Sequence, residues 1–237
     1  MRSPVKALPN HYESEFDRET GNRIESYITP ILSAERWKVY HFHDTSWNSG
    51  MKQDHDTSDS EYLQNDAANI APFLYMLKKS RRSNYDDIMR AVKMVAPYIK
   101  EFVLEPSSAN HDLIRLKWMQ NGCDEVFGPN QLSDGTLRFI CLATLLLQPP
   151  ELQPSAIILD EPKLGLHPAA ISLFAELVHM TSQKKQMIIS TQSPDLLDAF
   201  NPDDVIVTEM TPEGTAFERL SSGRLEEWLE DCSLSSV

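Results

Sequence analysis

Ala156-Ile-Ile-Leu-Asp160-Glu161-Pro162 is the stretch of the 237-residue chain that decides the fold: an apolar run that ends in two carboxylates. Such a run, bounded by polar residues, predicts a buried strand. In a parallel α/β sheet the carboxyl ends of the strands open onto the ligand crevice. Two acids there suit a magnesium site, where Asp160 holds the ion and Glu161 polarises an attacking water. On these residues alone, a strand that ends in a polar loop explains the pattern equally well.

Helices and strands alternate around this stretch. The expected order is a helix at 136–147, a strand at 156–159, a helix at 168–182, a strand at 186–190 and a further short strand at 205–208. Alternation of this kind predicts a parallel sheet with right-handed crossovers. The predicted fold class is therefore α/β, with a mostly parallel sheet flanked by helices.

The turn Leu132-Ser-Asp-Gly-Thr136 opens the first of these helices. Ser133 is a suitable N-cap, and Gly135 permits a close backbone approach. The exposed amides and the positive end of the helix dipole suit a terminal phosphate, especially one presented by another chain. In isolation, an ordinary helix cap is the simpler explanation.

Three phrases in one order make these motifs specific: LSDGTLRF (132–139), AIILDEPKLGLHP (156–168) and MIISTQSPDLLDAF (187–200). Together they resemble the signature, Walker B, D-loop and switch regions of ABC-type ATPases of the SMC/RecF-like group (AAA family ATPases, AAA_21-like). The weaker phrases VYHFHDTS (39–46) and DAANIAPFL (66–74) extend the resemblance toward the front. The resemblance implies a P-loop NTPase fold of the ABC ATPase type, with a small helical insertion.

The resemblance also implies roles for single residues, with ATP and Mg²⁺ as cofactors. Asp160 would bind Mg²⁺, and Glu161 would be the catalytic base for ATP on its own chain. The residues expected to contact nucleotide across a dimer are Ser133, Asp134, Gly135 and His167, the last from the D-loop. Such sites are composite, so the implied partner is a second copy of the chain or a partner ATPase half.

Two residues depart from the family pattern. Lys163 stands where the family usually has a second glutamate, which replaces an acid near the metal with a cation. Gln192 stands where ABC proteins commonly have a switch histidine. A glutamine can hydrogen-bond a phosphate or a water but cannot accept a proton, so Gln192 is expected to be a catalytic-site sensor rather than a base.

The phosphate-binding P-loop is absent from this sequence, because none of its eight glycines is followed by lysine. Without the amides and lysine of that loop, nucleotide affinity should be poor. Family members would have the loop on an amino-terminal segment. A strand next to the Ser190 strand would then also be missing, which predicts an exposed sheet edge unless another chain or the lead-in covers it.

The expected domain organisation has three parts. They are a lead-in at 1–35, amino-terminal strands with a helical insertion at 36–128, and the signature, Walker B, D-loop and switch part of an ATPase domain at 129–237. Within the second part we expect a strand at 36–42, a loop at 44–60, helices at 70–79 and 85–99, and a hairpin between 102–104 and 113–118, with Pro97 bending or ending the second helix.

Composition limits the remaining choices. A net charge of -13 opposes sequence-independent attraction to nucleic acid by the chain as a whole. Three scattered cysteines indicate neither a disulfide framework nor a CxxC metal site, and there is no apolar run long enough to cross a bilayer. A cytoplasmic protein without membrane contact is expected. His43 with Asp44 could suggest a metal or catalytic pair, but the spacing of His41, His43 and His55 fits no zinc pattern. A structural role, or one next to the Q-loop, is therefore the favoured expectation for these histidines.

The leading hypothesis is an ATP-binding and ATP-hydrolysing engine whose nucleotide-driven dimerisation acts on DNA or on an effector protein. The alternative is a non-catalytic interaction module that has lost ATP turnover, which the missing P-loop and Lys163 favour. A nuclease of the overcoming-lysogenization type would need an acidic Toprim domain after the ATPase, and the sequence contains none.

Overall fold

The computed structural model describes residues 37–212 and 214–220, so the lead-in predicted for residues 1–35 lies outside the described part. The described residues from Lys38 onward belong to one compact unit. The α-helices are α2 (Ile70–Ser80), α3 (Arg82–Val95), α4 (Asp134–Leu147), α5 (Pro168–Ser182) and α6 (Pro194–Leu197), with 3-10 turns η3 (Gly50–Lys52), η4 (Pro129–Gln131) and η5 (Pro202–Asp204). The strands are β1 (Trp37–Tyr40), β2 (His55–Asp56), β3 (Ile99–Val103), β4 (Leu113–Ile114), β5 (Lys117–Gln120), β6 (Val126–Phe127), β7 (Ala156–Asp160), β8 (Gln186–Ser190), β9 (Ile206–Thr211) and β10 (Gly214–Arg219). No helix in this described part has the length and apolar character needed to cross a membrane.

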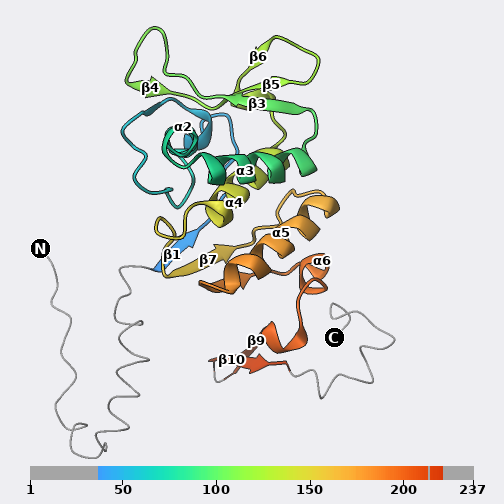
Figure 1. Cartoon of the computed structure of the whole chain (residues 1–237). Helices are drawn as coiled ribbons and strands as arrows, with labels where there is room; N and C mark the ends of the chain where they lie inside the picture. Colours follow the sequence, from blue (N-terminus) through green and yellow to red (C-terminus); the bar gives the residue numbers. More distant parts are fainter. Residues whose placement is uncertain (1–36, 213, 221–237) are drawn as a thin grey trace, which may run out of the picture. The chain divides into compact units, whose positions relative to one another are not determined.

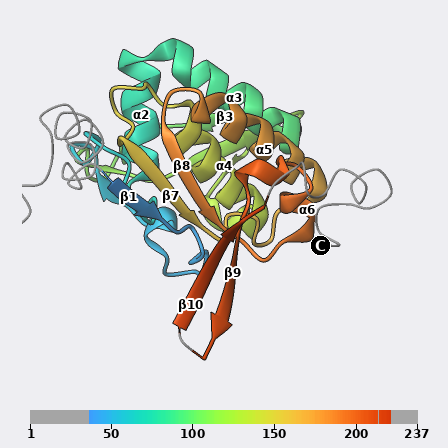
Figure 2. The same cartoon turned by 90° about the horizontal axis from the view of Figure 1, so that it is seen from below.

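Strands β1, β7 and β8 form a three-stranded sheet in that order (Figure 2). Figure 1 shows β1 beside β7. β7 and β8 run parallel, in a register that places Ala156 beside Gln186 and Asp160 beside Ser190. Helix α5 connects them and packs against β8, as a parallel crossover requires. These observations confirm the predicted α/β class with a parallel sheet and helices.

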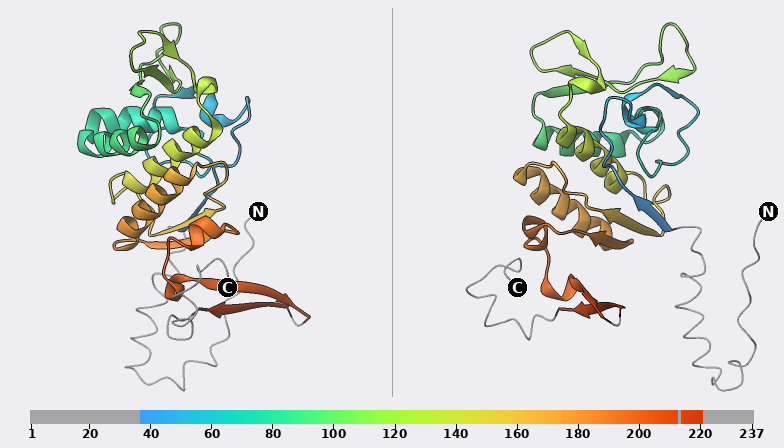
Figure 3. Two further views of the ribbon diagram at one scale, coloured as in Figure 1. Left: turned by 90° about the vertical axis from the view of Figure 1, so that its right-hand side faces the viewer. Right: turned by 180° about the vertical axis from the view of Figure 1, so that it is seen from behind.

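Helices α3, α4 and α5 lie side by side, with α4 in the middle (Figure 3). Phe139 on α4 and Phe174 on α5 are fully buried and form part of one continuous apolar core. The Ser133 hydroxyl oxygen accepts a hydrogen bond from the Thr136 amide at the start of α4, which confirms the predicted N-cap. Helix α5 has the predicted bounds, with Pro168 in its first turn.

The predicted helical insertion is the pair α2 and α3, which pack against each other. Of the two effects predicted for Pro97, bending or ending the second helix, the structure shows the second, so the helix does not reach Ile99. Because Pro97 has no amide hydrogen and disfavours helical backbone at Ala96, α3 ends at Val95. Ile99 begins β3 instead.

The hairpin predicted between 102–104 and 113–118 is only partly correct. β3 does pair antiparallel with β5. The first part of the second run separates as β4, which pairs with β2 inside the predicted loop 44–60. A main-chain hydrogen bond of 2.8 Å from the Thr57 amide to the Asp112 carbonyl extends this pairing. Patterns of neighbouring residues could not show that the polar loop pairs with β4, because β2 and β4 are far apart in the sequence.

The strand predicted at 205–208 exists as β9, but it pairs antiparallel with β10 in a separate hairpin (Figure 2). On one face of this hairpin Met210 and Phe217 are 80% and 72% exposed. Within the part of the chain that the structure describes, β8 is therefore an edge of the parallel sheet, as the sequence predicted.

Candidate functional site

The carboxyl end of β7 presents Asp160, whose side chain is exposed. Ser190 ends the neighbouring strand β8 and donates its hydroxyl hydrogen bond to Oδ1 of Asp160 at 2.7 Å. This bond orients one carboxylate oxygen while the side chain stays open to solvent. Parallel pairing of β7 and β8 thus places the predicted metal ligand at the expected edge of the sheet.

Glu161, the second acid, is held by the segment that follows β8. Its carboxylate accepts hydrogen bonds from the Gln192 amide at 2.9 Å and from the Thr191 hydroxyl at 3.3 Å. Its own amide donates to the Ser190 carbonyl at 2.9 Å. The backbone of Glu161 has a φ of 40°, a left-handed value that costs a side-chain-bearing residue energy. Strained backbone of this kind is concentrated at functional sites, and nothing in the sequence signalled it.

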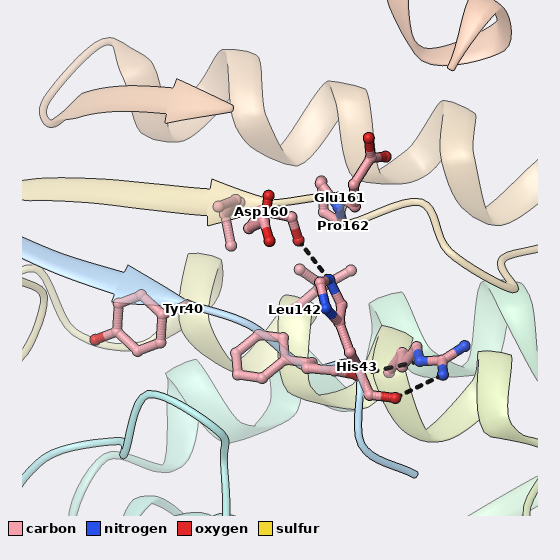
Figure 4. Close-up of a pocket in the computed structure, with 9 residues that line it drawn as sticks. Tyr40, His43, Leu142, Asp160, Glu161 and Pro162 are labelled. Carbon is pink, nitrogen blue, oxygen red and sulfur yellow. Dashed lines mark hydrogen bonds between the residues drawn. The ribbon is translucent and has the colours of Figure 1, made fainter. Parts of the chain in front are cut away.

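His43 lies next to Asp160 although the two are distant in the sequence (Figure 4). Its Nε2 atom is 2.9 Å from the carbonyl oxygen of Asp160. A carbonyl only accepts hydrogen bonds, so Nε2 is the donor. A small hollow beside this contact is lined in part by Tyr40, Leu142 and Glu161. The sequence did not connect His43 with the strand that ends at Asp160.

The side chains of His43 and Asp44, considered as a possible metal or catalytic pair, do not hydrogen-bond to each other. Hydrogen bonds from the hydroxyl and amide of Ser46 hold the pKa of Asp44 below its ordinary value. His55 donates from Nε2 to the Gly50 carbonyl at 2.8 Å. In residues 37–212 and 214–220 no group of three or more His, Cys, Asp or Glu side chains could hold a metal ion.

The signature turn is a well-formed helix N-terminus. The Ser133 hydroxyl lies 2.8 Å from the Thr136 hydroxyl in addition to capping the Thr136 amide. Asp134 places Oδ1 3.4 Å from Nζ of Lys52, whose side chain is buried. Ser133 and Asp134 therefore have defined positions at the positive end of the α4 dipole.

The expected D-loop, Gly165-Leu166-His167-Pro168 with Leu164 directly before it, packs against this signature turn. A Cβ atom on Gly135 would lie 2.2 Å from the carbonyl oxygen of Gly165, so only glycine fits there. Gly165 itself has a φ of +73°, which favours glycine. His167 caps α5, with Nδ1 accepting from the Ala169 amide at 3.3 Å. The sequence explained Gly135 by phosphate approach and missed its contact with the D-loop.

The residues that depart from the family pattern have partners of their own. Lys163 pairs with Asp195, the second residue of α6, with 3.8 Å between Nζ and Oδ2. Gln192 contributes its main-chain amide to Glu161. Gln192 is thus adjacent to the predicted base through its main chain.

These residues fit one half of a site for Mg²⁺ and a nucleoside triphosphate. Mg²⁺ typically binds one or two carboxylates and completes its octahedral shell with waters and phosphate oxygens. An exposed carboxylate at Asp160, oriented by Ser190, meets that requirement. The phosphate cradle has no counterpart in this sequence, because it contains no P-loop pattern.

Residues 15–198 match the protein family described as "AAA domain, putative AbiEii toxin, Type IV TA system". No curated protein matches the chain. An SMC head bound to the C-winged helix domain of ScpA has a TM-score of 0.51 and 14% sequence identity, over 72% of this chain and 50% of that one. An SMC ATPase studied for ATP-driven dimerization and DNA-stimulated activation has a TM-score of 0.49 and 16% identity, over 67% of this chain and 96% of that one. A nucleotide-free ATP-binding cassette from an ABC transporter has a TM-score of 0.40 and 12% identity, over 85% of this chain and 68% of that one. The chain thus shares the fold of the ScpA-bound SMC head and spans half of its length.

Proposed function

The chain belongs to this family of AAA domains, which is an SMC/ABC-like family of P-loop ATPases, and we propose that the chain binds and hydrolyses ATP as part of a composite ATPase. One observation supports the proposal most directly. Two acids at the end of β7 are oriented by hydroxyl and amide groups from the end of β8, at the crevice edge of a parallel sheet. A strand that merely ends in a polar loop gives no reason for the strained backbone at Glu161.

Asp160, Glu161 and Gln192 would each have a separate role in hydrolysis. Bound Mg²⁺ would neutralise charge on the triphosphate, and Asp160 would hold it directly or through water. Glu161 would orient and polarise the attacking water, since the Thr191 hydroxyl and the Gln192 amide fix its carboxylate. Gln192 would respond to the terminal phosphate through this same segment.

A segment with a P-loop must complete the site, and the edge strand β8 is where we propose that it docks. Val39 on β1 and Ile188 on β8 are 46% and 43% exposed, which is unusual for apolar side chains in the middle layer of an α/β domain. Ile158 lies beside Ile188 in the register of the sheet. A strand added to β8 with its following helix would cover the exposed Ile188 side chain and bring its loop next to Asp160.

The second half of each site would come from another protomer. Ser133, Asp134 and Gly135 form a helix N-terminus suited to a terminal phosphate, and His167 lies in the adjacent D-loop. ATP bound between two such chains would hold them together. The dimer would be a homodimer or include a partner ATPase half, and DNA or an effector protein is the proposed target of its motion.

The test is ATP binding and hydrolysis by the chain alone and by the chain mixed with a P-loop segment encoded upstream. Glu161→Gln should abolish hydrolysis and accumulate an ATP-bound dimer, whereas Glu176→Gln, which alters an exposed acid on α5, should not. Ser133→Arg should prevent nucleotide-dependent association, and Ser172→Arg on the exposed face of α5 is its control. If neither Glu161→Gln nor Ser133→Arg changes nucleotide-dependent association, the composite site is refuted.

The alternative function, a non-catalytic interaction module, is favoured by Lys163, whose cation replaces an acid of the family pattern. That function predicts no ATP binding by the chain in either the isolated or the mixed sample. Activity only in the mixture would instead identify the chain as one half of a split ATPase.

A further inference from the structure

Arg138, in the second turn of α4, donates four hydrogen bonds to segments that are distant in the sequence. Nε donates to the Phe42 carbonyl at 3.1 Å, and one terminal nitrogen donates to the His43 carbonyl at 2.8 Å and to the Thr45 hydroxyl at 3.2 Å. The other terminal nitrogen donates to the Leu164 carbonyl at 2.9 Å. One guanidinium thus joins α4 to the loop after β1 and to the D-loop.

These acceptors are neutral oxygens, and no carboxylate of the described residues lies within ion-pair distance of Arg138. Attraction to an acid is therefore not what holds the side chain. The planar fork of five donors matches acceptors in two directions, which a lysine ammonium cannot do. The geometry, rather than the charge alone, determines the arrangement.

The two loops that Arg138 holds are also bound to the signature turn and to the Walker B strand. Lys52 donates to the Thr45 carbonyl at 2.5 Å and lies 3.4 Å from Asp134, so the loop after β1 has a second attachment to α4. His43, in that loop, donates to the Asp160 carbonyl. The D-loop contacts the signature turn through Gly165 and Gly135.

We infer that Arg138 is a positioning residue that makes the signature turn, the loop 42–45 and the D-loop move as one body. Displacement of the signature turn by a phosphate from the partner protomer is then transmitted, through His43 and Leu164, to the Asp160–Glu161 pair of the same chain. The link between the two half-sites rests on the proposed function, whereas the mechanical coupling of the loops does not.

Hydrogen exchange tests the coupling without nucleotide. The amides of Leu164 and Leu166 bond to the carbonyls of Glu161 and Lys163, so they report on the D-loop. In Arg138→Gln and Arg138→Lys, peptides over 41–47 and 161–168 should both exchange about tenfold faster or more, while peptides from α3 and β8 keep their protection. Arg90→Gln, which changes an exposed arginine on α3, is the matched control and should leave both loops protected.

Three results would overturn the inference. Wild-type protection in Arg138→Lys would mean that charge suffices, and faster exchange in only one loop would mean that the loops are independent. Equal acceleration throughout Arg138→Lys, including α3 and β8, would mean that Arg138 supports the whole fold rather than this unit.

Turnover separates positioning from nucleotide contact. In the assembly completed with a P-loop segment, Arg138→Lys should lower kcat about tenfold or more and leave KM for ATP within about twofold, because Arg138 contacts loops rather than nucleotide. A raised KM with unchanged kcat would contradict the positioning role. If the wild-type assembly does not hydrolyse ATP, the proposed function fails, and the exchange result still decides whether the loops are coupled.

Discussion

Gly135→Ala should destabilise the protein, although glycine-to-alanine changes inside helices ordinarily do the opposite. Helix propensity alone predicts a gain of about 1 kcal/mol. In the structure, however, the new Cβ would lie 2.2 Å from the Gly165 carbonyl oxygen and 3.2 Å from its carbonyl carbon. The D-loop must therefore move by about 1 Å, and overpacking of this kind typically costs about 1–3 kcal/mol. Since the shift also strains the Arg138 bond to the adjacent Leu164 carbonyl, we expect a net loss of about 1–2 kcal/mol.

Urea denaturation and thermal melting measure this change, which should lower Tm by about 5 °C for a domain of this size. Gly128→Ala is the matched control, because its Cβ would meet only the flexible end of the Gln131 side chain at 3.3 Å. The control should stay within about 0.5 kcal/mol of wild type. A Gly135→Ala protein that is as stable as wild type, or more stable, would refute the packing of the D-loop against the signature turn.

Three further predictions concern other groups. Ser133→Ala should cost about 1 kcal/mol in urea denaturation, because the Thr136 amide loses its cap; an unchanged midpoint would contradict the capping role. Burial raises the pKa of Tyr85 to about 12, so the folded state favours the neutral phenol. The stability that this preference contributes is complete below the ordinary pKa of tyrosine, near 10, and is lost as the pH rises toward about 12. Tyr85→Phe should therefore lose less stability than wild type between about pH 8 and about pH 11, and parallel losses would argue against this. Burial also raises the pKa of the Cys141 thiol, so a thiol reagent followed by mass spectrometry should label the partly exposed Cys123 in the native protein and Cys141 only after unfolding.

The elements that sequence patterns predicted best are those with strong local signals. The β7–α5–β8 unit combines apolar runs, a proline in the first helical turn and strand ends marked by polar residues, and all three elements were found. Ser133 was predicted as the cap of α4 for the same reason. Local signals failed where pairing depends on a distant segment. β4 was expected to be part of a hairpin with residues 102–104, but it pairs with β2.

The candidate site divides in the same way. The two acids at the end of β7 were visible in the sequence, because an apolar run that stops at adjacent carboxylates is a local pattern. Their hydrogen bonds from the end of β8 depend on strand order and register, which become known only when the sheet is assembled. His43 illustrates the difference most clearly, since 117 positions separate it from the carbonyl that it contacts.

The sequence by itself determined the α/β class, the order of the motifs and the residue types at the site, because helix and strand periods, caps and motif spacings act over a few neighbouring residues. Only the tertiary structure decided that Gly135 packs against Gly165, that Arg138 joins two loops to the signature helix and that Glu161 has a strained backbone. Packing and hydrogen bonding act between whatever atoms the folded chain brings together, and close packing leaves no room for a single extra methyl group at Gly135.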